Sequence, residues 1–230
     1  KFMDNEDNAE SNYRLLNNLF DELQIRENKH DIKSLLHLLL NISNNHHREH
    51  NFYDRIGQIL IIFKEEIKQT FSNIIIFSMF KSNKRMLLLL SELGIMTINE
   101  EILDEIEIQK YIGLKYIHYF LPEIKHFFDA DSIKKLTDEM PKSFVENIEK
   151  FNECRKFGEN DSYICSLIRN DSIDDFISYV NKENIPFDYN IENSIFETNQ
   201  FLIGRKTSLI EYSAFFGSIQ IFKYLHNNKI

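Results

Sequence analysis

The sequence predicts an all-α protein in two parts: a helical region over about 1–155 and a helix-turn-helix solenoid over about 156–230. Apolar residues recur at helical spacing along almost the whole chain, and no stretch alternates apolar with polar residues over six positions. The 230 residues include only 6 Gly and 3 Pro, which is few for a loop-rich β fold. We therefore expect almost no β-sheet.

Amphipathic helices are expected from the start of the chain. A second helix should run from Ile32 to Leu40 with Asp31 as its N-cap, and a third apolar face extends from Phe52 to Ile67. The first helix is marked by a stripe with a period of 3.6 residues, made by Leu15, Leu16, Leu19, Phe20 and Leu23.

A helical hairpin is expected near 73–95. Its two segments, 73–80 and 84–93, are separated by a short polar turn. Gly94 follows the second segment, at the place where a helix C-terminus favours a left-handed residue.

The middle of the chain is expected to hold shorter helices. Apolar spacing over 102–120 predicts one or two helices that end at Pro122. Asp131 or Ser132 is expected to cap the next helix, because short polar side chains accept hydrogen bonds from the free amides of a first turn.

Near the C-terminus the pattern changes to short paired helices. The first pair is predicted at 161–169 and 173–182, and the second at 208–216 and 219–227. A helix of about nine residues is unstable alone, because nucleation is costly and few hydrogen bonds follow. These pairs should therefore stack on each other, as in a solenoid.

The last pair resembles an ankyrin repeat, whose pattern runs T-P-L-H-x-A-A-x-x-G-H-x-x-V-V-x-x-L-L-x-x-G-A. The residues at 208–230 run S-L-I-E-Y-S-A-F-F-G-S-I-Q-I-F-K-Y-L-H-N-N-K-I. Ser208 matches the Thr, Ser213 and Ala214 match the Ala pair, and Gly217 matches the inter-helix Gly. The resemblance implies a second repeat at about 207–230.

The same stretch departs from the ankyrin pattern at three positions. Leu209 stands in place of Pro, Glu211 in place of His, and Lys229 in place of the closing Gly. An earlier degraded copy is expected at about 161–185, and the hairpin near 73–95 is repeat-like.

Most of the chain also resembles ankyrin-repeat proteins of some protists that carry an N-terminal helical domain of unknown function. The phrases that carry this likeness are Leu36-His37-Leu38-Leu39-Leu40, Asn44-Asn45-His46-His47-Arg48, Gly158-Glu159-Asn160-Asp161 and Leu209-Ile210-Glu211-Tyr212. The likeness implies a fold and no known activity.

Composition argues against several classes of partner. Lys and Arg number 27 against 36 Asp and Glu, a net charge of −9, whereas nonspecific nucleic-acid binding needs basic residues. Apolar runs reach five residues, far short of the roughly 20 that span a bilayer. The first residues are acidic and polar, unlike a secretory signal. We expect an intracellular, cytoplasmic protein with reduced thiols at Cys154 and Cys165.

No residue pattern predicts catalysis. His46, His47 and His50 surround Glu49, yet no third metal ligand follows, so we interpret the segment as a solvated connection. Walker loops, GxGxxG, GxSxG and kinase signatures are absent from the sequence. We therefore expect no catalytic residues, no metal and no cofactor.

The segment 186–206, between the two C-terminal pairs, is longer than an ordinary connection between repeats. Aromatic residues and Arg are the types that anchor protein interfaces. The alternative, which we favour, is that the aromatic residues cover the edge of the array, because large exposed apolar patches are rare in monomers. The candidate partner-binding residues are Phe187, Tyr189, Phe196, Phe201 and Arg205.

The leading hypothesis is a non-catalytic protein–protein interaction module. The first alternative is a structural or self-assembling helical scaffold, in which the N-terminal helices form a homo-oligomer; an unrecognised enzyme is a distant third. Because the last helix would border an open end, the natural polypeptide is expected to continue into further repeats. The sequence does not identify the partner.

Overall fold

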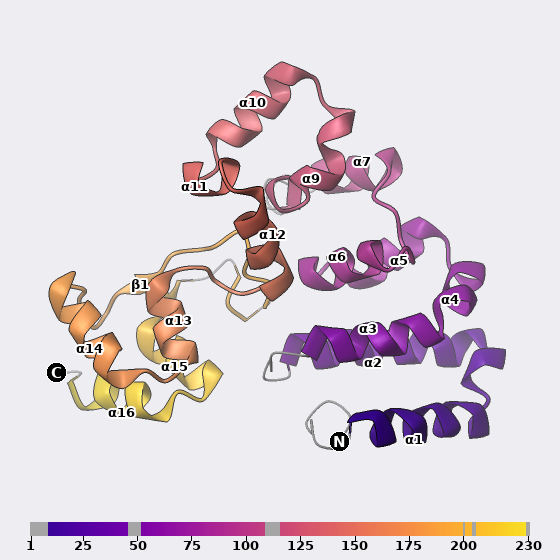
Figure 1. The fold of residues 1–230 in the computed structure, drawn as a ribbon, viewed down its shortest axis with the longest axis horizontal. Helices are drawn as coiled ribbons and strands as arrows, with labels where there is room; N and C mark the ends of the chain where they lie inside the picture. The colour runs from indigo at the N-terminus through magenta and orange to yellow at the C-terminus, as the bar shows by residue number, and fades with distance from the viewer. Residues whose placement is uncertain (1–8, 46–51, 109–115, 200, 204–205, 229–230) are drawn as a thin grey trace. The chain divides into compact units, whose positions relative to one another are not determined.

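The described part of the chain is mostly helical. The computed structural model describes residues 9–45, 52–108, 116–199, 201–203 and 206–228 (Figure 1). Among these residues, strand is limited to two short segments, β1 (Asn190–Ile191) and β2 (Thr207–Ser208). The predicted all-α class is confirmed.

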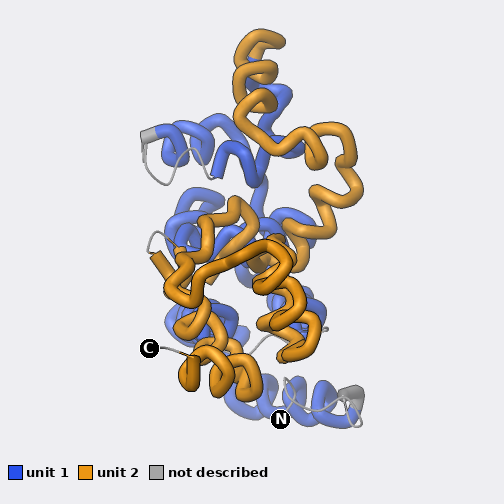
Figure 2. Tube along the Cα trace, turned by 90° about the vertical axis from the view of Figure 1, so that its left-hand side faces the viewer, with its two compact units in different colours: residues 1–128 blue, residues 129–230 orange. Residues whose placement is uncertain are grey.

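The chain divides into two compact units, residues 1–128 and 129–230 (Figure 2). This division differs from the domain boundary predicted near residue 155, which falls inside the second unit. The reason is a cluster of aromatic rings: Phe196 lies 4.9 Å from Phe144 and 5.4 Å from Phe151, between ring centroids. These contacts bind the helices before residue 155 to the C-terminal part.

The first unit is a series of helices joined by short connections. In chain order they are α1 (Ala9–Glu22), η1 (Ile25–Glu27), α2 (Lys29–Asn45), α3 (Phe52–Ile62), α4 (Lys64–Thr70), α5 (Asn73–Phe80), α6 (Lys84–Glu92), α7 (Glu100–Ile108), α9 (Leu121–Ile124) and η2 (Lys125–Phe127).

The second unit begins with three separate helices and ends with two pairs. In chain order its elements are α10 (Ala130–Asp138), α11 (Lys142–Val145), α12 (Ile148–Phe157), α13 (Tyr163–Arg169), α14 (Ile173–Lys182), β1, β2, α15 (Leu209–Phe216) and α16 (Ile219–Asn228). Predicted and observed bounds agree to within about two residues for α13 to α16.

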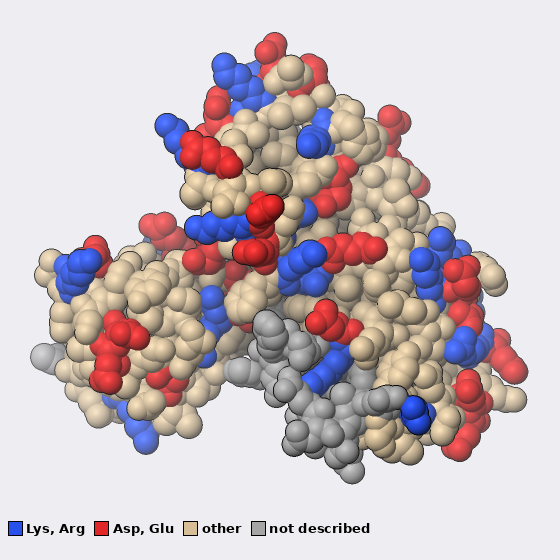
Figure 3. Space-filling model, in the orientation of Figure 1, with Lys and Arg blue, Asp and Glu red and all other residues tan. Residues whose placement is uncertain are grey.

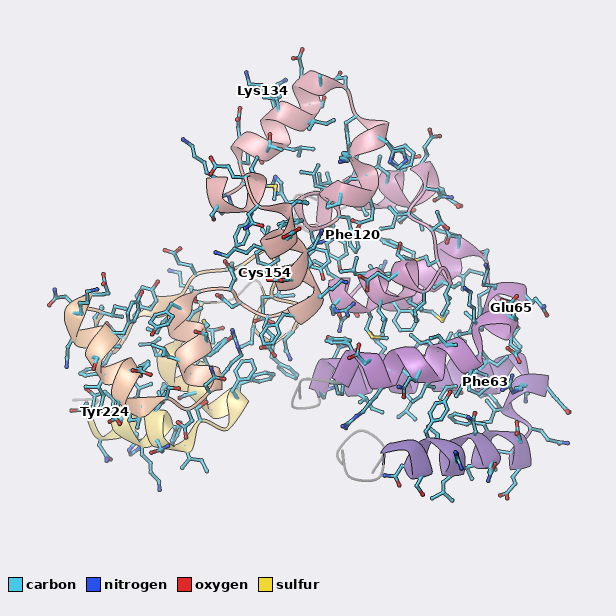
Figure 4. All side chains as sticks on the ribbon, in the orientation of Figure 1. Phe63, Glu65, Phe120, Lys134, Cys154 and Tyr224 are labelled. Atoms are coloured by element: carbon cyan, nitrogen blue, oxygen red, sulfur yellow. The ribbon has the colours of Figure 1, made fainter. Side chains whose placement is uncertain are left out.

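The core of the first unit forms around α6. The five residues 86–90 are all buried, because α6 packs against both α3 and α5 and so has no open side along this run. On the other side of α3, Phe63 reaches toward α1 (Figure 4), and its ring meets that of Phe20 edge to face at 4.9 Å.

Two basic residues are buried at the start of α6. Lys84 and Arg85 are at most 5% exposed. The Lys84 ammonium lies 5.2 Å from the Tyr119 ring, and the Arg85 guanidinium lies 4.6 Å from the Tyr53 ring. Arg85 also pairs with Glu92 at 3.4 Å. Both side chains therefore lie against aromatic rings inside the unit.

Two predicted helix caps are wrong by a few residues. The α2 helix begins before Asp31, and Asn28 accepts the His30 backbone N–H at 2.9 Å instead. The N-cap of α10 is Asp129, which accepts the Ser132 N–H at 2.7 Å, rather than Asp131 or Ser132. In both cases another polar residue two or three positions earlier caps the helix, which sequence spacing alone does not distinguish.

The expectation that a helix ends at Pro122 is also wrong. Pro122 lies in the first turn of α9, where its missing N–H costs nothing because that amide has no partner in a helix. By contrast, Gly94 adopts the expected left-handed conformation after α6, with φ of 63°.

Charge is distributed over the surface. On the face drawn in Figure 3, Lys and Arg side chains are interspersed with those of Asp and Glu in both units. The net charge of −9 is therefore not gathered into one acidic region on that face. Within the described ranges, no helix has the length and apolarity needed to cross a membrane.

The contact between Phe20 and Phe63 generates a stability prediction. We expect Phe63→Ala to lower the free energy of unfolding by about 3–5 kcal/mol, because it empties a fully buried ring site. Ile61→Ala, at a 55% exposed position two residues earlier, should change it by less than about 0.5 kcal/mol. Urea unfolding followed by circular dichroism measures both; equal effects would contradict this account of the core.

Candidate functional site

The two C-terminal helix pairs share one apolar core. Each first helix packs on the other first helix, α13 on α15, and each second helix on the other second helix, α14 on α16. The buried side chains of this core are Ile164, Cys165, Leu167, Ile168, Phe176, Val180, Ile191, Leu202, Leu209, Tyr212, Phe216, Ile221 and Leu225.

The turns inside the two pairs have the same backbone form. The Ser172 N–H donates to the Leu167 carbonyl at 3.0 Å, and the Ser218 N–H donates to the Ser213 carbonyl at 2.9 Å. Each turn contains one left-handed residue, Asp171 with φ of 49° and Gly217 with φ of 69°. These are Schellman motifs, which close a helix and reverse the chain.

The same turns also hold the pairs together. The Asp171 carboxylate accepts the backbone N–H groups of Gln220 at 3.1 Å and Ile221 at 3.0 Å, and so caps α16 from the neighbouring pair. In the opposite direction, the Ser218 hydroxyl donates to the Ile168 carbonyl. Stacking is thus fixed by directed hydrogen bonds as well as by apolar burial.

A short hairpin lies between the pairs. Strands β1 and β2 are antiparallel, with Asn190 opposite Ser208 and Ile191 opposite Thr207. Ser208 ends β2 and caps α15 in a capping box: its hydroxyl accepts the Glu211 N–H at 3.4 Å, and the Glu211 carboxylate accepts the Ser208 N–H at 2.8 Å. Glu211 thus completes the capping box at the start of α15.

The insertion, residues 186–206, is joined to the helices mainly through buried groups. Phe196 is 0% exposed, and the Thr198 hydroxyl donates to the Gly158 carbonyl at 2.7 Å. The Asn160 amide donates to the Glu192 carbonyl at 2.8 Å. The described residues of the insertion therefore contact the segment between α12 and α13 through hydrogen bonds, and Phe196 is buried.

Arg169 forms the centre of a buried polar network, which sequence reasoning missed. Its Nε lies 2.9 Å from a carboxylate oxygen of Glu159, a residue only 4% exposed. Its Nη1 donates to the Asn160 carbonyl at 2.8 Å and to the Tyr212 hydroxyl at 2.8 Å. One guanidinium thus joins the segment before α13 to the middle of α15.

The network continues into the insertion. The Asn160 N–H donates to one carboxylate oxygen of Glu197 at 3.3 Å, and the Asn199 N–H donates to the other at 2.8 Å. The Asn199 side chain then accepts the Phe201 N–H at 2.9 Å. A chain of hydrogen bonds therefore runs from Arg169 to the backbone of Phe201.

Burial shifts the pKa values of the groups around this network. Burial raises the pKa of Cys165 to about 11 and moves the pKa of Tyr212 well above its usual value. Burial would lower the pKa of Arg169, but Tyr212 and Glu159 outweigh that effect and raise it. Arg169 stays charged, while Cys165 and Tyr212 stay protonated at neutral pH.

Exposed aromatic rings lie beside the buried network. Phe157 is 54% exposed, Phe201 53% and Phe215 38%. The Arg169 guanidinium lies 5.4 Å from the Phe157 ring and 6.0 Å from the Phe216 ring. Phe216 lies 5.0 Å from Phe215, which lies 6.4 Å from Phe201. We call Phe157, Phe201 and Phe215 the aromatic surface.

The candidate partner-binding residues occupy different environments. Phe187 and Tyr189 are half-buried against the shared core, and Phe187 lies 5.8 Å from Tyr224 of α16, which Figure 4 labels. Phe196 is fully buried, so its ring is not at the surface, and Phe201 is exposed. Arg205 lies outside the described residues, as do His46, His47 and His50.

Two members of the aromatic surface were not among the sequence candidates. Phe157 and Phe215 both lie within two residues of a glycine that ends a helix, Gly158 and Gly217. The signal in the sequence was an aromatic residue close to a glycine that is expected to end a helix. In the part of the chain that the structure describes, no group of three or more His, Cys, Asp or Glu side chains could hold a metal ion.

A hollow of about 380 Å³ lies in the first unit, beside the starts of α5 and α7. Several of its polar groups bond to one another: the Asn73 side chain accepts the Thr97 N–H at 2.8 Å and donates to the Thr97 carbonyl at 2.5 Å. Asn99 caps α7 by accepting the Ile102 N–H at 3.2 Å. These side chains serve the local structure of the unit.

Comparisons with protein-family models, with curated proteins and with solved structures found no match for this chain.

The contacts of Asp171 predict how strongly the pairs are coupled. Asp171→Asn preserves the left-handed backbone, which Asn tolerates, but leaves one carbonyl oxygen where two carboxylate oxygens accepted N–H groups. We expect the free energy of unfolding of the second unit to fall by about 1 kcal/mol. Denaturant titration measures this free energy. A value equal to that of the wild type would show that Asp171 does not couple the two helix pairs.

Proposed function

We propose that the chain is a non-catalytic protein–protein interaction module whose C-terminal part is an ankyrin-type array of two helix pairs. The observation that carries the proposal is the stacking of α13 on α15 and of α14 on α16, with an antiparallel hairpin between the pairs. An array of this kind presents side chains from successive units on one continuous surface.

Burial supports a repeat relationship between the pairs. Small Ser213 and left-handed Gly217 occupy positions that an ankyrin repeat gives to Ala and Gly. Buried positions of the first helix pair recur in the second pair at the same spacing along the sequence. The corresponding residues are Ile164 and Leu209, Leu167 and Tyr212, Ile168 and Ser213, Phe176 and Ile221, and Val180 and Leu225.

The aromatic surface is the part of the array best suited to a partner. Aromatic rings give large contact area for little loss of conformational freedom, and they are enriched among residues that dominate binding energy. Phe201 and Phe215 come from the insertion and from α15, so a partner that covered both would contact two elements of the array.

A comparison of variants tests this proposal. Affinity capture from the native cell, with mass spectrometry, should enrich a protein with the wild-type chain and lose it with the double variant Phe201→Ala and Phe215→Ala. With that protein purified, calorimetry should give an affinity at least about 30-fold weaker for the double variant, the loss expected for truncated anchor residues.

Tyr163→Ala provides the matched control, because Tyr163 is a 56% exposed aromatic residue at the other end of α13 from Arg169. It should bind as the wild type does. Phe196→Ala is unsuitable as a binding variant because it would disturb the core. Wild-type affinity in the double variant would clear the aromatic surface of a role.

The alternative function, a self-assembling helical scaffold, is favoured by one feature of α1. Leu15, Leu19 and Leu23 repeat every fourth residue and are 63%, 47% and 59% exposed. They form an exposed apolar stripe along α1 and the residue that directly follows it, beside the buried Phe20. A second copy of the chain could cover this stripe with its own.

Light scattering over a range of concentrations tests the scaffold. Self-association through α1 predicts a mass that rises above the monomer and returns to it when Leu15, Leu19 and Leu23 are all changed to Ser. Leu38→Ser, at a 54% exposed position of α2, is the control and should leave association unchanged. A strict monomer at high concentration would exclude the scaffold.

A further inference from the structure

We propose that Arg169 is the positioning residue of the aromatic surface, holding the Phe201 segment of the insertion in one arrangement before any partner binds. The use of that surface in binding rests on the proposed function. The positioning itself does not, and it can be measured on the chain alone.

The Arg169 guanidinium reaches three groups from two chain segments. Arg169 contacts Glu159, the Asn160 carbonyl and the Tyr212 hydroxyl at once, from two of its nitrogen atoms. The guanidinium makes these contacts from two nitrogen atoms held in one plane, whereas a lysine ammonium has its three N–H donors on a single nitrogen. Replacing Arg169 therefore cannot preserve the whole arrangement.

Hydrogen bonds connect Arg169 to the backbone of Phe201. Asn160, held through its carbonyl by Arg169, donates its own N–H to Glu197, and Glu197 also accepts from Asn199. Asn199 in turn accepts the Phe201 N–H and, through its backbone carbonyl, the N–H groups of Leu202 and Ile203 at 3.0 Å each. The position of Phe201 thus depends on groups that Arg169 fixes.

Arg169 also lies close to the aromatic rings. Its guanidinium lies within 6.0 Å of the Phe157 and Phe216 ring centres, and Phe216 borders Phe215. The same side chain therefore contacts one member of the aromatic surface directly and supports the other two through neighbours. A surface already held in its binding arrangement loses less conformational freedom when a partner arrives.

Amide hydrogen exchange of the intact chain tests the positioning. We expect Arg169→Lys, which keeps the charge opposite Glu159, to speed exchange of the Asn199 and Phe201 amides by about tenfold. Exchange in α13 to α16 should change much less. Glu197→Gln should have a similar local effect, because a Gln side chain has one oxygen where the carboxylate accepts two N–H groups.

Asp171→Asn is the matched control. It also replaces a carboxylate that accepts two backbone N–H groups in the same unit, but those groups belong to α16 and not to the insertion. It should speed exchange in α16 and leave Asn199 and Phe201 unchanged. Should Arg169→Lys fail to fold, Glu197→Gln against Asp171→Asn decides the question.

A fluorescent reporter gives a second measurement. The chain contains no Trp, so Phe201→Trp places a single indole at a half-exposed position of the aromatic surface. Acrylamide should quench this indole more strongly when Glu197→Gln or Arg169→Lys is added, and no more strongly when Asp171→Asn is added. Unchanged exchange and quenching in both network variants, or equal loosening by Asp171→Asn, would overturn the proposal.

Discussion

The C-terminal helix pairs depend on the mutual burial of helices too short to persist alone. Helix α13 has seven residues and α15 has eight, fewer than an isolated helix needs in water. Their stability comes from one apolar core that all four helices of the two pairs line. Because every helix in this set completes the burial of another, the pairs are expected to gain or lose structure together.

A long insertion adds a separate requirement, since backbone polar groups taken out of water need partners. The Gly158 carbonyl accepts the Thr198 N–H, the Asn160 side chain donates to the Glu192 carbonyl, and the Glu197 carboxylate accepts the Asn199 N–H. This explains why charged residues lie inside the second unit: Glu159 and Arg169 satisfy each other there, and removal of either alone would leave a buried charge. Both the insertion and the helix pairs are therefore held by polar contacts together with buried apolar side chains.

Apolar periodicity was enough to predict the helical class and the limits of α14, because those features depend on local spacing along one chain segment. It did not predict the N-cap of α10, because several neighbouring polar residues can cap a helix. It also did not predict the role of Pro122, because proline is common both after the end of a helix and in its first turn. The contacts of Arg169 could not be predicted from local spacing, because they join residues up to 43 positions apart. Phe201 could be named in advance as an aromatic residue, but its exposure, and the burial of Phe196, depend on folded neighbours.

The ring of Phe196 also limits how this architecture can be dissected. Phe196 belongs to the part of the insertion between β1 and β2, and its ring packs against Phe144 of α11 and Phe151 of α12. A piece cut to begin at residue 156 would keep both helix pairs yet strip this ring of its two aromatic neighbours. The two helix pairs are therefore not expected to fold as an independent fragment. A fragment that keeps the Phe196 contacts has to begin before α11.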